Sequence, residues 1–93
     1  MFEWDENKRR LTIAKHLIDF SDAIEVLANE PLILPARSDV EARYIAVGPL
    51  DGTLIAVVFT MRRQTYRLIR ARRARQDEQD QYQNLHLGRG PQA

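Results

Sequence analysis

The first third of the chain places apolar residues at helical spacing in two consecutive segments. In the first segment, residues 6–18, the positions that share one helical face are Leu11, Ala14, Leu17 and Ile18. The polar residues on the other side are Lys8, Thr12, Lys15 and His16. Asp5 is a candidate N-cap, and Glu6 in the first turn suits the helix dipole. The pattern predicts an amphipathic helix, and residues 2–4 before it can form a short strand.

The second segment, residues 19–30, predicts another helix. Its apolar positions follow the i, i+3, i+4, i+7 pattern and are Phe20, Ala23, Ile24 and Leu27. Asp19 or Ser21 can cap its start. Pro31 disfavours helical conformation at the residue before it, so this helix is expected to end at Glu30 or earlier.

Beyond Pro31 the pattern changes from a helical to a β period. Four short segments rich in β-forming residues follow, at 31–36, 42–48, 53–60 and 65–71. Asp51 and Gly52 signal a hairpin between the second and the third segment, and residues 61–64 form a short connection before the fourth. Because the connections are short, we expect consecutive strands to pair as an antiparallel meander.

The fourth of these segments contains most of the stretch "RLIRARRAR", residues 67–75. Strand alternation predicts two faces for it. One face would carry Tyr66, Leu68, Arg70 and Arg72. The other would carry Arg67, Ile69, Ala71 and Arg73. Arg72 and Arg73 could therefore reach one phosphate only if the strand ended between them.

Residues 75–85 predict a third helix, which has Gln76, Asp77 and Glu78 in its first turn, where the dipole favours negative charge. The expected fold class is α+β, with a short N-terminal strand, two helices, an antiparallel sheet of about four strands and a C-terminal helix. We expect the helices to lie over one face of the sheet. A single domain is expected at 1–84, followed by a mobile tail at 85–93.

Length and composition exclude several classes of protein. A chain of 93 residues can bury one modest core. It has no cysteine, so it cannot form a disulfide or a thiolate site. The longest apolar run, residues 54–59, is too short to span a membrane, and the N-terminus lacks the apolar stretch of a signal peptide. We expect a soluble, cytoplasmic protein with no membrane contact.

The net charge of +1 hides a strong local asymmetry. Ten of the thirteen acidic residues lie at or before Asp51, and seven of the fourteen basic residues lie between Arg62 and Arg75. Arginine outnumbers lysine by 12 to 2, which favours paired hydrogen bonds to phosphate oxygens over simple solubility. The alternative for the arginine run is a charged edge strand that prevents aggregation. The asymmetry indicates a polyanion or an acidic protein as the partner.

Several other residues are candidates for chemistry, each with a plainer alternative. His16 beside the lysines of its helix could transfer a proton, whereas a lone surface histidine is usually inert. Lys8 and Lys15 taken singly are most simply solvated helix charges. Glu78 and Tyr82 share a helix face, and an ion pair from Glu78 to an arginine is favoured over a catalytic role.

Six short motifs, in this order, resemble the BrnT toxin family. They are "WDENK" (4–8), "KH" (15–16), "FSDA" (20–23), "RYIAVG" (43–48), "VVFTMR" (57–62) and "RLIRARRA" (67–74), followed by Glu78 and Tyr82. The resemblance implies a RelE-like fold and a ribonuclease toxin of a type II toxin–antitoxin module that arrests translation. It also implies a BrnA-like, DNA-binding antitoxin, which would contact operator DNA and form a complex of two toxins and two antitoxins.

The chain departs from the family pattern at four positions. The family usually has asparagine at Thr12, glycine at Leu17, serine at Arg70 and a threonine-like N-cap at Arg75. Thr12 and Arg70 bear on activity if they lie in the active site. A glycine at position 17 would serve as a helix C-cap, so Leu17 suggests a different helix ending.

RNA cleavage without a metal ion or cofactor needs a base, positive charge at the phosphate and an acid. The residues expected to be catalytic are His16, Arg62, Arg72 and Arg73. Those expected to bind RNA are Lys8, Lys15, Arg67 and Arg70, and Glu78 and Tyr82 are possible supporting residues. Two alternatives stay open: a nucleic-acid-binding module that does not cleave, and a degenerate toxin that only binds its antitoxin.

Overall fold

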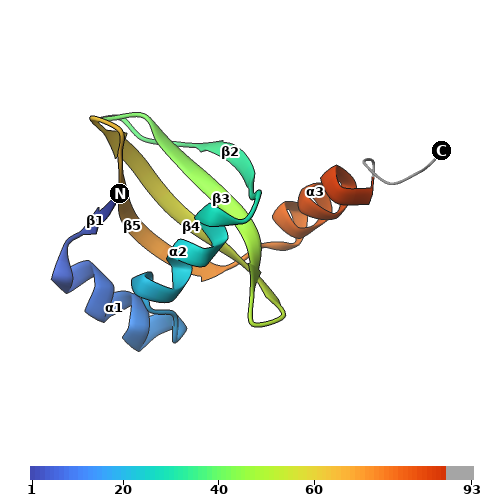
Figure 1. Ribbon diagram of the computed structural model, residues 1–93, viewed down its shortest axis with the longest axis horizontal. Helices are drawn as coiled ribbons and strands as arrows, with labels where there is room; N and C mark the ends of the chain where they lie inside the picture. The colour runs from blue at the N-terminus through green and yellow to red at the C-terminus, as the bar shows by residue number, and fades with distance from the viewer. Residues whose placement is uncertain (88–93) are drawn as a thin grey trace.

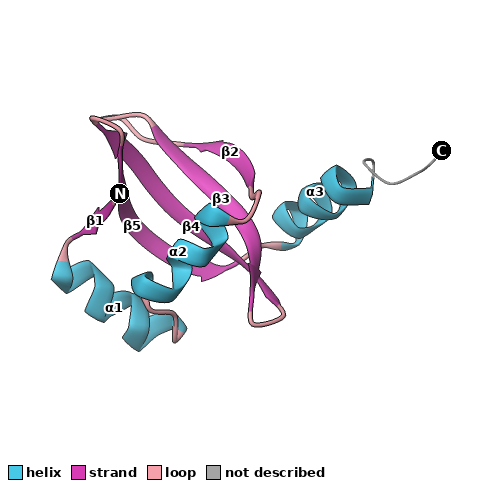
Figure 2. Ribbon diagram, viewed as in Figure 1, coloured by secondary structure: helices cyan, strands magenta, loops and turns pink. Residues whose placement is uncertain are grey.

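The structure is a computed structural model that describes residues 1–87 of the chain. Its centre is a five-stranded sheet with the strand order β1-β5-β4-β3-β2 (Figures 1 and 2). The strands are β1 (Phe2–Trp4), β2 (Leu32–Ala36), β3 (Arg43–Leu50), β4 (Thr53–Arg62) and β5 (Thr65–Arg73). Three helices complete it: α1 (Glu6–His16), α2 (Phe20–Ala28) and α3 (Gln76–Leu87). The expected α+β order is confirmed.

The sheet is mixed rather than wholly antiparallel. The meander β2–β3–β4–β5 pairs antiparallel as expected, but β1 adds a fifth strand that runs parallel to β5. The Tyr66 backbone N–H also donates to the Met1 carbonyl (2.9 Å), which extends this pairing. A three-residue strand carries too little pattern to show its partner, so its place in the sheet could not be read from the sequence.

The β3–β4 and β4–β5 hairpins each turn through two residues in the left-handed region. Asp51 and Gly52 have φ of 52° and 80°, which confirms the expected Asp-Gly hairpin. Arg63 and Gln64 have φ of 51° and 72° without any glycine. Positive φ at both central residues matches the twist of the flanking strands. The second connection is therefore two residues shorter than the 61–64 expected, and β4 continues to Arg62.

The helix caps follow the sequence closely. The Asn7 backbone N–H donates to Asp5 Oδ1 (2.8 Å) and the Ser21 backbone N–H donates to Asp19 Oδ1 (3.0 Å), so both aspartates are N-caps. Helix α3 ends at Leu87, so the first three residues of the expected tail are helical. The rest of that tail, residues 88–93, lies outside the described residues. No helix within residues 1–87 has the length and apolar character needed to cross a membrane.

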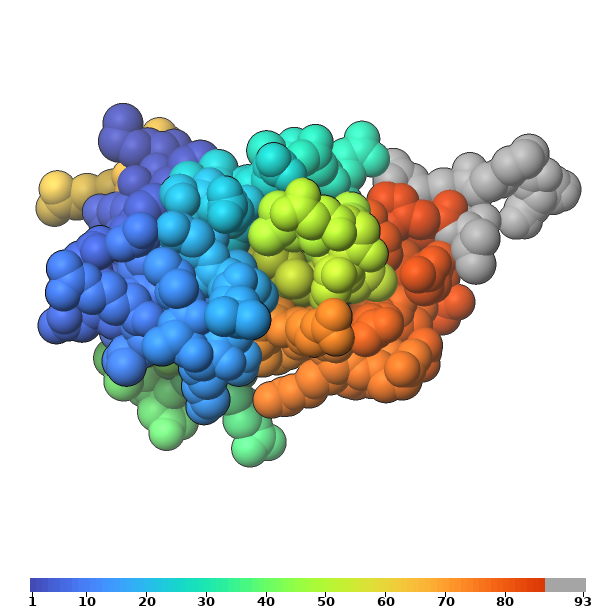
Figure 3. All heavy atoms as spheres, turned by 90° about the horizontal axis from the view of Figure 1, so that it is seen from below, coloured from blue at the N-terminus to red at the C-terminus, as the bar shows by residue number. Residues whose placement is uncertain are grey.

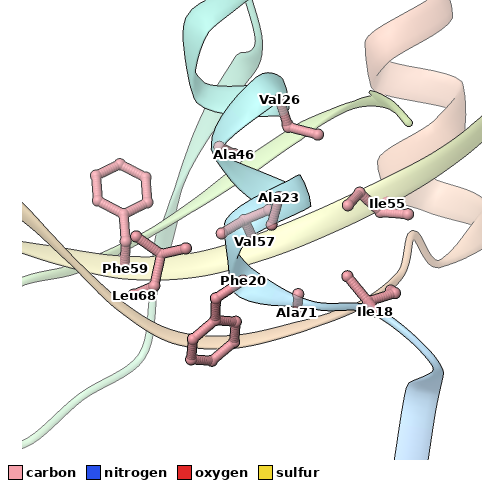
Figure 4. Close-up of a cluster of buried hydrophobic side chains, with 10 residues drawn as sticks. All are labelled: Ile18, Phe20, Ala23, Val26, Ala46, Ile55, Val57, Phe59, Leu68 and Ala71. Atoms are coloured by element: carbon pink, nitrogen blue, oxygen red, sulfur yellow. The ribbon is translucent and has the colours of Figure 1, made fainter. Parts of the chain in front are cut away.

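Two apolar clusters lie on opposite faces of the sheet. On one face α2 buries Phe20, Ala23 and Val26 against strand residues that include Val57 and Leu68 (Figure 4). On the other face Tyr82 of α3 packs against a smaller cluster, whose buried members are Val47, Ala56 and Ala74. The expectation that the helices share one face is therefore wrong. Residues 55–60 of β4 are all buried, so both faces of that strand need cover.

Helix α1 does not bury the apolar face that its spacing predicts. Leu11 is 69% exposed and Leu17 is 87% exposed, whereas Thr12 is only 6% exposed. The buried and half-buried positions of α1 are Arg9, Thr12, Ile13 and His16. The Arg9 guanidinium donates to both carboxylate oxygens of Asp19 (2.9 and 3.0 Å), which joins this side of α1 to the N-cap of α2. The side of α1 that faces the rest of the protein is therefore the one that carries Arg9, Thr12 and Ile13, and not the one that carries Leu11 and Leu17.

The same ion pair makes stability depend on pH. Hydrogen bonds from the Arg9 guanidinium and from the Ser21 backbone lower the pKa of Asp19 to about 2. Because this value is below the unfolded value of about 3.9, the carboxylate stabilises the fold above pH ~4 and loses that effect as the pH falls toward 2. We expect Asp19→Asn to lower the free energy of unfolding at neutral pH and the difference from the wild type to shrink near pH 2.

Urea unfolding of both proteins between pH 7 and pH 2 measures this difference. Asp22→Asn is the matched control, because Asp22 lies in the first turn of α2 without capping it. A wild-type-to-variant difference that stays constant over the whole pH range would contradict the assignment.

Candidate functional site

A β-bulge in β5 decides where its arginines point. Val58 pairs with Arg70 while Phe59 pairs with Leu68, so Ile69 is an extra residue with no partner on β4. Leu68 and Ala71 consequently lie in the same core cluster, on the α2 face. The alternation expected for residues 66–73 therefore fails beyond Leu68.

The bulge gathers arginines on the face opposite α2. Residues that pair directly across antiparallel strands share a face, so the register assigns sides. Arg73 pairs with Ile55 of the α2-face cluster and lies on that side. The arginines of the opposite face are Arg67, Arg70 and Arg72. Arg72 and Arg73 point to opposite faces, as expected, but Arg67 and Arg70 now share one face.

A pocket of about 620 Å³ opens between α1 and this arginine-bearing face, and we call it the α1 pocket. Helix α1 contributes side chains at i, i+3, i+4 and i+7, a spacing that aligns one helical face along the pocket. The lining residues are Lys8, Leu11, Thr12, Ala14, Lys15, His16, Arg43, Ile69 and Arg70. In Figure 3, α1 and α2 (blue) lie on one side of the molecule, with the segment leading into β3 (green) beside them and α3 (red) on the far side.

The lining of the α1 pocket is basic and contains no carboxylate. Within residues 1–87, neither Lys8 nor Lys15 nor Arg70 forms an ion pair. Arg43 does, through its Nε, which lies 3.4 Å from Glu41 Oε2. Unpaired cations that converge on a concave surface raise the local concentration of anions. His16 stands among them, half-buried at the end of α1.

Arg72, although on the same face, is held by Glu78. The guanidinium donates from Nη1 and Nη2 to the two carboxylate oxygens (2.8 and 2.9 Å), and the two side chains are 13% and 6% exposed. Glu78 also accepts from the Arg75 backbone N–H (2.7 Å), which caps the first turn of α3. These hydrogen bonds, chiefly the one from Arg72, lower the pKa of Glu78. The ion pair that the sequence suggested for Glu78 is present.

The other candidate residues lie outside the α1 pocket. Arg67 pairs with Glu3 of β1 (3.0 Å), and Arg62 at the β4–β5 turn lies 3.6 Å from Glu41. Arg73, at the end of β5, lines a second pocket of about 350 Å³ between the β3–β4 turn and α3. Tyr82 of α3 packs against the smaller apolar cluster of the sheet. The structure thus brings His16 together with Lys8, Lys15 and Arg70, and not with Arg62, Arg72 or Arg73.

Sequence reasoning missed Arg43 as a site residue. Arg43 begins β3, and strand alternation places its side chain on the same face as Ile45 and Val47, opposite α2. A basic residue two positions before the first of two alternating apolar residues predicts that this face of the strand ends in a charge. Its distance from Arg70 depends on the strand order, which places β4 between them. Among residues 1–87 there is no group of three or more His, Asp and Glu side chains that could hold a metal ion.

Leu17 ends α1 in the conformation that favours glycine. Its φ and ψ are 59° and 32°, in the left-handed region, and its N–H donates to the Ile13 carbonyl (2.9 Å). The different helix ending expected for a leucine is therefore not found. Because the side chain is almost wholly exposed, it offsets little of the steric cost of about 1 kcal/mol.

We expect Leu17→Gly to raise the free energy of unfolding by up to about 1 kcal/mol, because it removes this strain without loss of packing. Urea denaturation compares it with Leu11→Gly, in which another exposed leucine has helical backbone. That control is expected to destabilise by about 1 kcal/mol. Destabilisation by Leu17→Gly would show that the cap is not strained.

Fold and site together define a class of protein. A small α+β chain with a helix-flanked pocket of unpaired cations around a histidine has the side chains needed to bind and cleave a phosphodiester. The ribonuclease-toxin family model BrnT, of type II toxin–antitoxin systems, matches residues 4–78. The chain belongs to this family of ribonuclease toxins.

A solved structure agrees with this assignment. The chain is similar to the Brucella abortus ribonuclease toxin BrnT at 33% sequence identity, over 82% of this chain and 100% of that chain, with a TM-score of 0.64. No curated protein matches the chain significantly. Membership of a type II toxin–antitoxin family implies an antitoxin partner and an RNA substrate.

Proposed function

We propose that the α1 pocket is the RNA-cleaving site and that cleavage uses only side chains of the protein, without a metal ion. One observation carries the proposal. His16 lies in a pocket whose other ionisable residues are all basic: Lys8, Lys15, Arg43 and Arg70. A group that can exchange protons thus stands among charges suited to phosphate.

The chemistry assigns a task to each kind of residue. The RNA 2′-hydroxyl attacks the adjacent phosphorus, its proton goes to a base, and the 5′-oxygen leaves with a proton from an acid. His16 moves one of these protons, because an imidazole can give or take a proton near neutral pH. Arg70 and the lysines stabilise the negative charge that grows on the phosphate oxygens.

Arg62, Arg72 and Arg73 take other roles in this proposal. Both terminal nitrogens of Arg72 donate to the Glu78 carboxylate, so Arg72 supports the junction of β5 with α3. Arg62 can contact RNA that extends beyond the pocket past Glu41. Arg73 lies on the wrong face for the same phosphate. The arginine of β5 that contacts the scissile phosphate in this proposal is Arg70, which replaces the family's usual serine.

The partner follows from the family and the charge. We propose a BrnA-like antitoxin that covers the α1 pocket with an acidic or helical segment and so blocks RNA. The complex would contain two toxins and two antitoxins, and it would contact operator DNA only through the antitoxin. Free of its antitoxin, the chain would cleave RNA in the cytoplasm and arrest translation.

Incubation of the purified, antitoxin-free chain with total RNA in excess EDTA tests the function. Cleavage that yields 2′,3′-cyclic phosphate ends supports it, since that product records attack by the neighbouring 2′-hydroxyl. Cleavage that needs added Mg²⁺ would overturn the metal-free mechanism. Binding without cleavage would favour the non-catalytic alternative. Growth arrest on induction, relieved by the antitoxin, separates a toxin from both.

A further inference from the structure

We propose that an apolar wall of the α1 pocket, made by Leu11 and Ile69, holds one unpaired nucleobase of a single-stranded RNA beside the phosphate held by the cations. The inference rests on the proposed function and extends it. It names the part of the substrate, besides phosphate, that the pocket recognises.

The first observation is the position of Leu11. Its side chain is 69% exposed, so it contributes little to the core. It lies between Lys8 and Lys15 on one face of α1, at i+3 from the first and i−4 from the second, and all three line the pocket. A single exposed leucine is ordinary, but one set between two unpaired lysines in a concave surface is placed where a ligand would meet it.

The second observation is the bulge. Ile69 is the extra residue of β5, without a partner on β4, and its half-buried side chain lines the pocket from the sheet. Apolar surface is thus contributed from both sides, by the helix and by the sheet. The next residue, Arg70, places a guanidinium beside Ile69 in the same pocket.

A ligand that matches this lining has an apolar ring next to a negative charge. A nucleotide has both within one unit, since every base has a π-face and every linkage carries a phosphate. A phosphate alone would leave the apolar wall in water. An apolar protein segment would leave three unpaired cations without counter-charges, so the charges favour RNA over a protein at this wall.

The size of the pocket also decides whether the bound RNA is single-stranded or duplex. Its volume of about 620 Å³ is that of a small-molecule site and is too small for a duplex. In A-form duplexes the bases are stacked and paired, and side chains cannot enter the deep major groove. The base in the α1 pocket must therefore come from a single-stranded region.

Two oligonucleotide probes separate contact with the base from contact with phosphate. Both are short, single-stranded and 2′-O-methylated, so they lack the attacking hydroxyl and are not cleaved; one carries bases and the other is abasic. We expect Leu11→Ser to weaken binding of the base-bearing probe about five- to ten-fold and to leave binding of the abasic probe unchanged. Leu17→Ser is the matched control, an exposed leucine outside the pocket, and is expected to change neither affinity.

Arg70→Ala separates failure of this inference from failure of the proposed function. It is expected to weaken both probes and to reduce the salt dependence of binding, because it removes a phosphate contact. If Leu11→Ser leaves both affinities unchanged while Arg70→Ala weakens both, the base subsite is overturned and the phosphate site stands. If the wild type binds neither probe, both proposals are overturned.

Discussion

Replacement of His16 by alanine is expected to lower the rate of RNA cleavage by about 100-fold or more and to leave the fold intact. The magnitude is that of a lost general acid or base. Stability should change little, because the side chain is only half-buried at the last residue of α1 and its loss opens no large cavity. The measurement is the cleavage rate of a fluorescent RNA substrate under single-turnover conditions, together with thermal unfolding of the variant.

The chain provides a matched control for this experiment. Its second histidine, His86, lies on α3 against Tyr82 and does not line the α1 pocket. We expect His86→Ala to cleave RNA at close to the wild-type rate. Full activity of His16→Ala would remove His16 from the mechanism, whereas equal losses in the two variants would indicate damage to the fold rather than to the chemistry.

Replacement of Glu78 by alanine is expected to lower the free energy of unfolding by about 3–5 kcal/mol. It leaves the Arg72 guanidinium largely buried without its counter-charge, and it removes the acceptor for the Arg75 N–H. Urea unfolding at neutral pH measures it, with Asp77→Ala, an exposed residue of the same turn, as the control.

A double variant tests whether Arg72 is structural. If it serves only to join β5 to α3, Arg72→Met combined with Glu78→Leu should recover most of the lost stability, since apolar residues can replace a buried ion pair. RNA cleavage by the double variant should then persist. A stable double variant without activity would return Arg72 to the catalytic residues.

The bulge at Ile69 explains why the arginine run divides as it does. Without it, Arg70 and Arg67 would point to opposite faces of the sheet. With it, Arg70 joins Arg43 and the lysines of α1, and Ile69 is released from pairing to line the same pocket. One inserted residue thus assembles both the charged and the apolar part of the candidate site. It also places Arg73 on the α2 face, opposite to Arg67.

The two departures from the family pattern that bear on activity meet in this pocket. Thr12 and Arg70 line it from the helix and from the sheet. An arginine where serine is usual adds a charge that can contact phosphate, while Thr12 is buried. We therefore interpret Arg70 as a change in how the phosphate is held rather than as a loss of the site.

Local features of this protein were predictable because they depend on neighbouring residues. The aspartate N-caps, the Asp-Gly hairpin, the end of α2 before Pro31 and the α+β order of elements all follow from short-range sterics, hydrogen bonding and periodicity. The grouping of Lys8, Lys15 and His16 on one side of a helix is equally local, because helical spacing alone brings them together.

The remaining features depend on contacts between residues far apart in the chain. Helix α1 is rotated so that Leu11 and Leu17 face water and Arg9 meets Asp19, and buried surface on both sides of β4 placed α2 and α3 on opposite faces. The pairing of β5 with β1 and the bulge at Ile69 are properties of strand register, and they decide which arginine of β5 is on the side of Glu78. The sequence by itself determined the elements and the supply of cations, whereas only the tertiary structure decided which cations share a pocket, because the face that a strand residue occupies changes with a single inserted residue.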